Sequence, residues 1–223
     1  MFQPQFRGSY GFGRRFEQAG YKQWGMAMQD DITDGVQYLI RQGIADPQRI
    51  CIYGASYGGY AALWGLVKTP DLYRCGISFA GVTDIGNMFK DWSDTNSSQA
   101  GREWRRFLVG NPDDDKARFD AVSPLKHADR IKAPVLLMHG EEDVRVPIEH
   151  GTKMVRALME LHKEYEWKSF PLEGHGLYYT DHRNEFYNTL LGFLDKYIGP
   201  ASTASKPPTG TPPLAVYDTA PVR

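Results

Sequence analysis

The sequence predicts an α/β domain in which a mostly parallel sheet is covered by helices on both faces. Strand-like runs alternate with helix-like patterns along the chain, which is the order that a parallel sheet requires. The 223 residues are 41% apolar and 24% charged, so the chain has the length and composition of one globular domain with a sizeable core. We expect this domain to occupy residues 1–199.

Four short apolar runs are the predicted strands. They are residues 49–54 (RICIYG), 75–81 (CGISFAG), 133–140 (APVLLMHG) and 165–171 (YEWKSFP). The first run is short and rich in apolar residues, which favours a strand buried on both faces. Because helical patterns separate the runs, we expect the strands to pair in parallel.

Three segments repeat apolar residues with the spacing of a helix, namely residues 30–43, 147–164 and 182–198. The long excursion of residues 82–130 breaks the alternation of strands and helices. An excursion of this length predicts a cap over a site rather than a simple connection. Residues 200–223 are rich in Pro, Ser and Thr, and we predict a disordered tail there.

Charge and cysteine content exclude several functional classes. The net charge of -1, from 26 basic and 27 acidic residues, gives no reason to expect nucleic acid or an anionic membrane as a partner. No apolar run approaches the ~18 residues of a membrane span, and the first residues do not resemble a secretion signal, so we expect a soluble protein of the cytoplasm or periplasm. Cys51 and Cys75 are expected to be buried, reduced thiols. We expect no metal and no cofactor.

The stretch GASYGG, residues 54–59, separates a predicted strand from a helix-like pattern. It matches the G-x-S-x-G elbow, in which a nucleophilic serine lies on a sharp turn between strand and helix. A serine hydroxyl needs a base, a group that orients the base, and donors for the oxyanion. We expect Ser56 to be the nucleophile, the Tyr57 N–H to be an oxyanion donor, and Gly54 and Gly58 to remove side chains that would collide across the turn. The alternative is a glycine-rich turn with an incidental serine.

An acid and a histidine follow the elbow in the order that such a serine predicts. Asp143 comes just past the third predicted strand, and His175 comes just past the fourth. His175 lies between two glycines, as suits a base in a close-approach loop. Glu141 and Glu142 are adjacent alternatives for the acid, and Asp84, one strand earlier, is another. We favour Asp143 because the orienting acid most often follows the penultimate strand.

The other five histidines are expected to have no catalytic role. His139 lies at a strand end and is expected to be packed there. Four histidines in charged or helical surroundings are expected at the surface: His127, His150, His162 and His182.

Several motifs in order along the chain resemble those of one enzyme family. They are FRGSYGFG, YKQWGMAMQDDITDGVQYLI, DPQRICIYGASYGGYAAL, SPLKHADRIKAPVLLMHGEEDVRVP and EGHG. Together they resemble the catalytic domain of the prolyl oligopeptidase family of serine peptidases, particularly its dipeptidyl-peptidase and acylaminoacyl-peptidase branches. The resemblance implies an α/β-hydrolase fold and a peptide substrate.

The resemblance also implies roles for individual residues. Ser56 would be the nucleophile, Asp143 the orienting acid and His175 the base. In that family the N–H of the residue after the serine serves the oxyanion, and Tyr57 matches that position. Aromatic side chains of the excursion line the family's specificity pocket, which makes three residues candidates for substrate binding: Tyr57, Phe89 and Trp92.

The chain also departs from the family pattern at its start. Members of the family carry a β-propeller, then three strands and a loop that supplies a second oxyanion donor. This chain begins at residues 2–6 (FQPQF), which would be the fourth strand. We therefore expect an α/β-hydrolase domain that lacks its first strands and leaves the elbow strand with an unpaired edge. Such an edge favours a homo-oligomer or association with the missing N-terminal part.

Three functions follow from these expectations. The first is a serine peptidase of the dipeptidyl, acylaminoacyl or oligopeptidase type that acts through an acyl-enzyme on Ser56. The second is a carboxylesterase, because the fold does not determine which acyl group is attacked. The third is an inactive remnant that acts only in association.

Overall fold

The computed structural model describes residues 1–94 and 98–200, apart from the side chains of residues 91–94. Within these residues one parallel sheet has the strand order β1-β2-β3-β4. Its strands are β1 (Cys51–Ala55), β2 (Cys75–Phe79), β3 (Val135–Gly140) and β4 (Tyr165–Phe170). The four predicted strands and the α/β class are confirmed. The predicted tail lies outside the described residues from position 201 onward.

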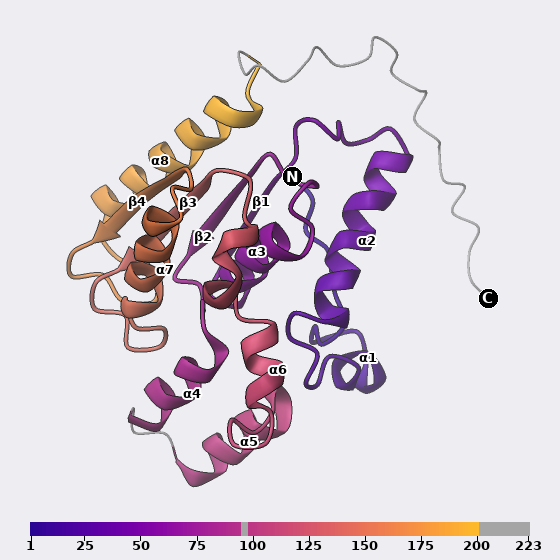
Figure 1. Cartoon of the computed structure of the whole chain (residues 1–223), viewed down its shortest axis with the longest axis vertical. Helices are drawn as coiled ribbons and strands as arrows, with labels where there is room; N and C mark the ends of the chain where they lie inside the picture. The colour runs from indigo at the N-terminus through magenta and orange to yellow at the C-terminus, as the bar shows by residue number, and fades with distance from the viewer. Residues whose placement is uncertain (95–97, 201–223) are drawn as a thin grey trace.

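Helices lie against both faces of this sheet (Figure 1). On one face are α3 (Tyr57–Lys68) and α7 (Glu149–Glu160), and on the other is α8 (Thr180–Ile198). A further helix, α2 (Ala27–Arg41), packs against α3. The helices predicted from apolar spacing are therefore confirmed.

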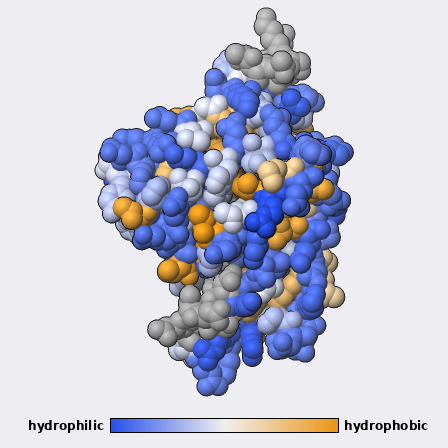
Figure 2. All heavy atoms as spheres, turned by 60° about the vertical axis from the view of Figure 1, so that its left-hand side comes forward, coloured by the Kyte–Doolittle hydropathy of each residue, from blue (hydrophilic) through white to orange (hydrophobic). Residues whose placement is uncertain are grey.

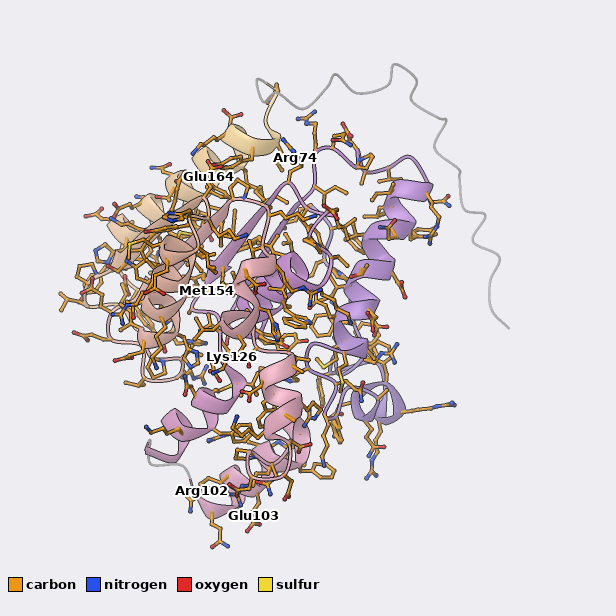
Figure 3. All side chains as sticks on the ribbon, viewed as in Figure 1. Arg74, Arg102, Glu103, Lys126, Met154 and Glu164 are labelled. Carbon is orange, nitrogen blue, oxygen red and sulfur yellow. A yellow bond between two sulfur atoms is a disulfide. The ribbon has the colours of Figure 1, made fainter. Side chains whose placement is uncertain are left out.

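Each face of the sheet has its own apolar core. The cluster under α3 and α7 includes Leu66 and Met154, both almost completely buried. Met154, labelled in Figure 3, is contributed by α7. The cluster under α8 includes Phe186 and Phe193, which belong to the apolar face that the sequence predicts for this helix. Burial of both faces stabilises the parallel arrangement.

The two central strands are buried along their whole length, whereas β1 is not. Tyr53 of β1 is 46% exposed, and Ala55 is exposed as well. Within the described residues β1 has a neighbour on one side only, which confirms the predicted unpaired edge of the elbow strand. The expectation that this strand is buried on both faces is wrong, because Tyr53 and Ala55 share one face of β1 and are exposed there.

Residues 2–6, expected as a strand beside the sheet, are not a strand. Phe2 lies over Gly35 of α2, and the Phe6 ring is 5.4 Å from the Tyr57 ring. The segment thus crosses the helices instead of following the sheet. Pro4 within it also lacks the N–H that a central strand would donate.

The long excursion after β2 is mostly helical. It consists of α4 (Ile85–Asp94), α5 (Gln99–Val109), α6 (Lys116–Ala121) and the 3₁₀ segment η1 (Pro124–Arg130). Figure 1 shows α4, α5 and α6 projecting away from the sheet, below it in that view. The short helix α1 (Arg14–Gln18) lies at the same lower end of the molecule. The chain therefore extends beyond the sheet at the end where β2 leads into α4.

No helix in the described part of the chain is both long enough and apolar enough to span a membrane. The face of the molecule shown in Figure 2 is largely hydrophilic, with separate apolar patches. The buried apolar side chains form the two cores described above.

The expectation of two reduced cysteines is wrong, because a disulfide joins Cys51 to Cys75. The two residues are direct partners in the register of β1 and β2, with Cα atoms 4.7 Å apart. Their separation of 24 residues along the chain hides this proximity, because the register of parallel strands is not visible in the sequence. The bond ties the edge strand to its only neighbour in the described sheet.

Removing this disulfide should destabilise the domain. A cross-link that closes a loop of this size stabilises by roughly 3 kcal/mol, mainly by constraining the unfolded chain. We expect Cys51→Ser to lower the free energy of unfolding by an amount of this order, measured by chemical denaturation of the oxidised protein. Cys75→Ser should have the same effect, because either substitution removes the same bond. Two titratable thiols in the unfolded, unreduced wild type would contradict the assignment.

Candidate active site

The turn at Ser56 joins β1 to α3 through a single residue. Ser56 has φ +55° and ψ −118°, a backbone conformation that costs a non-glycine residue of order 1–3 kcal/mol. Its N–H donates to the Phe79 carbonyl of β2 at 2.9 Å, and its carbonyl accepts from the Tyr60 N–H at 3.0 Å. The strained turn is therefore held by the sheet on one side and by the first turn of α3 on the other.

Close contact between backbones explains two of the glycines around this turn. A Cβ at Gly54 would lie 2.2 Å from the Gly58 carbonyl carbon, and a Cβ at Gly59 would lie 2.8 Å from the Gly81 Cα. A Cβ at Gly58 would meet no atom within 4 Å outside its own helix. The expected steric role is therefore confirmed for Gly54 and wrong for Gly58, and the sequence reasoning missed Gly59. The adjacent pair Gly58-Gly59 was the only feature of the sequence that pointed to Gly59.

One hydrogen-bonded line joins three of the predicted site residues. The distance from His175 Nε2 to Ser56 Oγ is 2.8 Å, and that from His175 Nδ1 to Asp143 Oδ2 is 2.7 Å. With the Nδ1–H donating to the carboxylate, Nε2 is left to accept the serine proton. The three residues lie in the loops that follow β1, β3 and β4, and the carboxyl ends of parallel strands meet at one edge of a sheet.

Asp143 is a buried carboxylate whose two oxygens are both occupied. Its side chain is 0% exposed, and Oδ1 accepts from the N–H groups of Arg145 at 2.8 Å and Val146 at 3.0 Å. Burial alone would raise the pKa of Asp143, but the His139 ring 3.5 Å from Oδ2 and hydrogen bonds from His175 and the Val146 N–H outweigh it and hold that pKa well below the usual range. The residue is therefore an anion at neutral pH, facing the imidazole.

The alternative acids lie elsewhere. Asp84 Oδ1 accepts from the Asn87 N–H at 3.1 Å, and its Oδ2 is 3.6 Å from Nζ of Lys126, which Figure 3 labels. Glu141 accepts from the Ser169 hydroxyl at 2.7 Å, and Glu142 is exposed. Of the four candidate acids, Asp143 is the one that His175 contacts in the described structure.

The backbone and the side chain of Tyr57 point to different roles. Its N–H opens α3 and has no acceptor among the described residues, as an oxyanion donor requires. Its ring lies 4.6 Å from the Trp24 ring and 5.4 Å from the Phe6 ring, and burial raises the pKa of its phenol. The ring is thus part of an aromatic core beneath the elbow.

The other two predicted pocket residues belong to α4. The Phe89 ring stacks on Phe119, with centroids 5.4 Å apart, and lines a hollow together with the cationic side chains of Lys90 and Arg102. In Figure 3 Arg102 lies at the end of the molecule farthest from α8. The side chain of Trp92 lies outside the described residues. A specificity pocket formed by Phe89 and Trp92 stays a prediction.

Two histidines form buried contacts near the site. His139 is 1% exposed, as expected for a packed strand end, and its Nε2–H donates to the Val146 carbonyl at 2.7 Å. His150, expected at the surface, is 3% exposed, so that expectation is wrong. Its Nδ1 accepts from the Thr83 N–H at 3.1 Å, which ties the start of α7 to the loop after β2. His150 lies in the first turn of α7, and the amphipathic spacing of this helix did not by itself indicate that the His150 side chain points toward the core.

A sequence profile of the prolyl oligopeptidase family matches residues 1–201 of this chain. Dipeptidyl aminopeptidase BIII of Pseudoxanthomonas mexicana is 34% identical over 200 residues, which are 87% of this chain and 28% of that protein. The acylamino-acid-releasing enzyme of Arabidopsis thaliana is 31% identical over 204 residues, which are 86% of this chain and 25% of that protein.

Solved peptidase structures share the fold. A puromycin-hydrolysing peptidase of Mycobacterium tuberculosis superposes with a TM-score of 0.80 at 28% identity, over 87% of this chain and 29% of that one. For an acylaminoacyl peptidase of Pyrococcus horikoshii the TM-score is 0.79 at 28% identity, over 90% of this chain and 33% of that one.

The parallel sheet, the sharp turn at Ser56 and the superposition on solved peptidase structures place this fold in the α/β-hydrolase class. The chain belongs to the prolyl oligopeptidase family, as its motifs predict. It spans between a quarter and a third of the length of these relatives.

The steric roles of the glycines can be tested with a matched pair of variants. In Gly54→Ala the new methyl group meets backbone, which cannot move aside as a side chain can. We expect a loss of about 3 kcal/mol in the free energy of unfolding, at the upper end of the usual cost of overpacking. Gly58→Ala has open space and a better helix former, so it should change stability by less than about 1 kcal/mol. Equal losses in denaturant titrations would contradict this account.

Proposed function

We propose that this chain forms the catalytic part of a serine peptidase that hydrolyses short peptides through an acyl-enzyme on Ser56. The observation that carries the proposal is the hydrogen-bonded line from Asp143 through His175 to Ser56. Membership of a family whose relatives are named dipeptidyl aminopeptidase and acylamino-acid-releasing enzyme supports a peptide substrate. In this proposal residues 1–199 are the catalytic domain.

In the first half of the reaction, Ser56 Oγ attacks the carbonyl carbon of the peptide bond while its proton moves to His175 Nε2. The carbonyl oxygen becomes an oxyanion, which the Tyr57 N–H at the start of α3 stabilises. The tetrahedral intermediate then collapses, the C–N bond breaks, and the His175 Nε2–H protonates the departing amine. The acyl group is left as an ester on Ser56.

In the second half, a water molecule takes the place of the amine. His175 Nε2 accepts a proton from this water as its oxygen attacks the ester carbon, and then returns the proton to Ser56 Oγ as the C–O bond breaks. Asp143 stays ionised throughout, because its lowered pKa keeps the carboxylate charged. Its charge orients the imidazole and stabilises the imidazolium in both halves.

The unpaired edge of β1 supports a second candidate, in which the chain acts through association. An open parallel edge offers a row of unpaired N–H and C=O groups to another strand. The partner would be a second copy or another part of a longer protein. A mouse relative, 27% identical to this chain, is named inactive dipeptidyl peptidase 10.

Active-site labelling tests the peptidase proposal. The wild type should form a covalent adduct with a fluorophosphonate probe, detected by intact-protein mass spectrometry. Ser56→Ala should abolish the adduct, and His175→Ala should slow it by about 10⁴-fold, because the base is lost. Ser169→Ala is the matched control and should be labelled like the wild type, since the Ser169 hydroxyl donates to the Glu141 carboxylate and not to a histidine. Equal labelling of Ser56→Ala and wild type would refute the assignment of the nucleophile.

The choice of substrate separates the remaining functions. We expect turnover of aminoacyl-p-nitroanilides as well as p-nitrophenyl esters, because His175 can protonate an amine leaving group. Turnover of esters alone would favour a carboxylesterase. A folded chain that hydrolyses neither substrate would favour the role in association.

A further inference from the structure

Glu173 is a buried carboxylate that the proposed reaction does not use. It lies two residues before His175, and its side chain is 0% exposed. Its oxygens accept three hydrogen bonds: from the Tyr178 N–H at 2.7 Å, from the Tyr179 N–H at 2.9 Å, and from His182 Nδ1 at 3.0 Å. Acidic side chains are rarely buried to this extent without a partner that fixes them.

These bonds keep the buried side chain ionised. Burial favours the neutral acid, but the N–H groups of Tyr178 and Tyr179 and the His182 ring outweigh it and lower the pKa of Glu173. A carboxylate has no proton to donate, so both oxygens are available as acceptors. Both carboxylate oxygens of Glu173 are therefore hydrogen-bond acceptors, and together they accept from the three donors that face them.

The main chain of Glu173 is tied to the loop that carries Asp143. The Glu173 carbonyl accepts from the Glu142 N–H at 2.8 Å. A Cβ at Gly140 would lie 2.1 Å from the Gly174 carbonyl oxygen, so the two backbones touch there. The segment just before His175 is therefore fixed against the loop that follows β3.

The side chain of Glu173 fixes the other end of the same loop. Tyr178 and Tyr179 immediately precede α8, and His182 lies in its first turn. His175 lies between the two fixed ends, in the short loop of residues 173–179. Its Nε2 must lie within reach of Ser56 while its Nδ1 meets Asp143. Both contacts depend on the path of this loop.

We propose that Glu173 is a positioning residue for His175, acting through Tyr178, Tyr179 and His182 to hold the loop in the conformation that reaches both Ser56 and Asp143. This inference rests on the proposed function, since it assigns to His175 the role of the base. Glu173 touches neither substrate nor reacting atoms in this role. Its loss should lower kcat and leave KM almost unchanged.

Glu173→Gln is the informative variant because it keeps the shape and changes the acceptors. A glutamine places an NH₂ group where one carboxylate oxygen was. In one orientation this NH₂ faces the Tyr178 N–H, and in the other it faces the Tyr179 N–H, so one backbone donor loses its acceptor either way. A second variant, His182→Phe, removes the side-chain donor and keeps a ring beside Phe170 and Tyr179. Glu185→Gln is the control, since Glu185 on the same helix forms an exposed pair with Lys168.

The experiment compares wild type and these variants in steady-state kinetics and by proton NMR. We expect Glu173→Gln to lower kcat on the order of 10²-fold, the cost of a misplaced catalytic group, with little change in KM. The deshielded Nδ1–H proton of His175, assigned by its absence in His175→Ala, should shift or broaden. His182→Phe should show a smaller loss in the same direction, and Glu185→Gln should match the wild type.

The two measurements separate this inference from the proposed function. If the wild type hydrolyses nothing, the proposed function fails, and the His175 proton still decides whether Glu173 positions the ring. An unchanged proton and unchanged kcat in folded Glu173→Gln would overturn the inference. If Glu173→Gln does not fold, His182→Phe decides: a lowered kcat with a shifted proton supports the inference, and wild-type values overturn it.

Discussion

The contact between the backbone of β1 and the backbone of α3 is the constraint on which the rest of the site depends. Gly54 lies directly against Gly58, and no side chain separates strand from helix. The chain can therefore reverse within one residue, and that residue is Ser56 at φ +55°. A larger residue at Gly54 would push α3 away, and with it the Tyr57 N–H. The strain at Ser56 is held by bonds to Phe79 and Tyr60.

The parallel sheet brings the partners of Ser56 to it from distant parts of the chain. His175 lies 119 residues from Ser56 and 32 residues from Asp143, yet both contacts are hydrogen bonds. The loops after β3 and β4 are also bonded to each other, through Glu142 and Glu173. Asp84, after β2, has its oxygens near the start of α4 and Lys126, which explains why it does not serve His175.

Local patterns in the sequence predicted most of the fold, because strands and helices with one buried face repeat apolar residues at a regular spacing. The order of serine, acid and histidine was equally readable, since each follows a predicted strand. The sequence does not record the register in which two strands pair, nor the direction in which a side chain or a segment points. The pairing of Cys51 with Cys75, the inward turn of His150 and the path of residues 2–6 over α2 depend on how elements pack. Gly58 was misread because spacing alone cannot tell which of two glycines faces the neighbouring backbone.

We propose that the turn at Ser56 aims its hydroxyl at His175 and the Tyr57 N–H at a developing oxyanion. A crystal structure of the chain after reaction with a diphenyl phosphonate tests this most directly. We expect phosphorus bonded to Ser56 Oγ, with a phosphonyl oxygen within hydrogen-bonding distance of the Tyr57 nitrogen. A phosphonate on another residue, or one on Ser56 whose oxygens all point away from Tyr57, would contradict it.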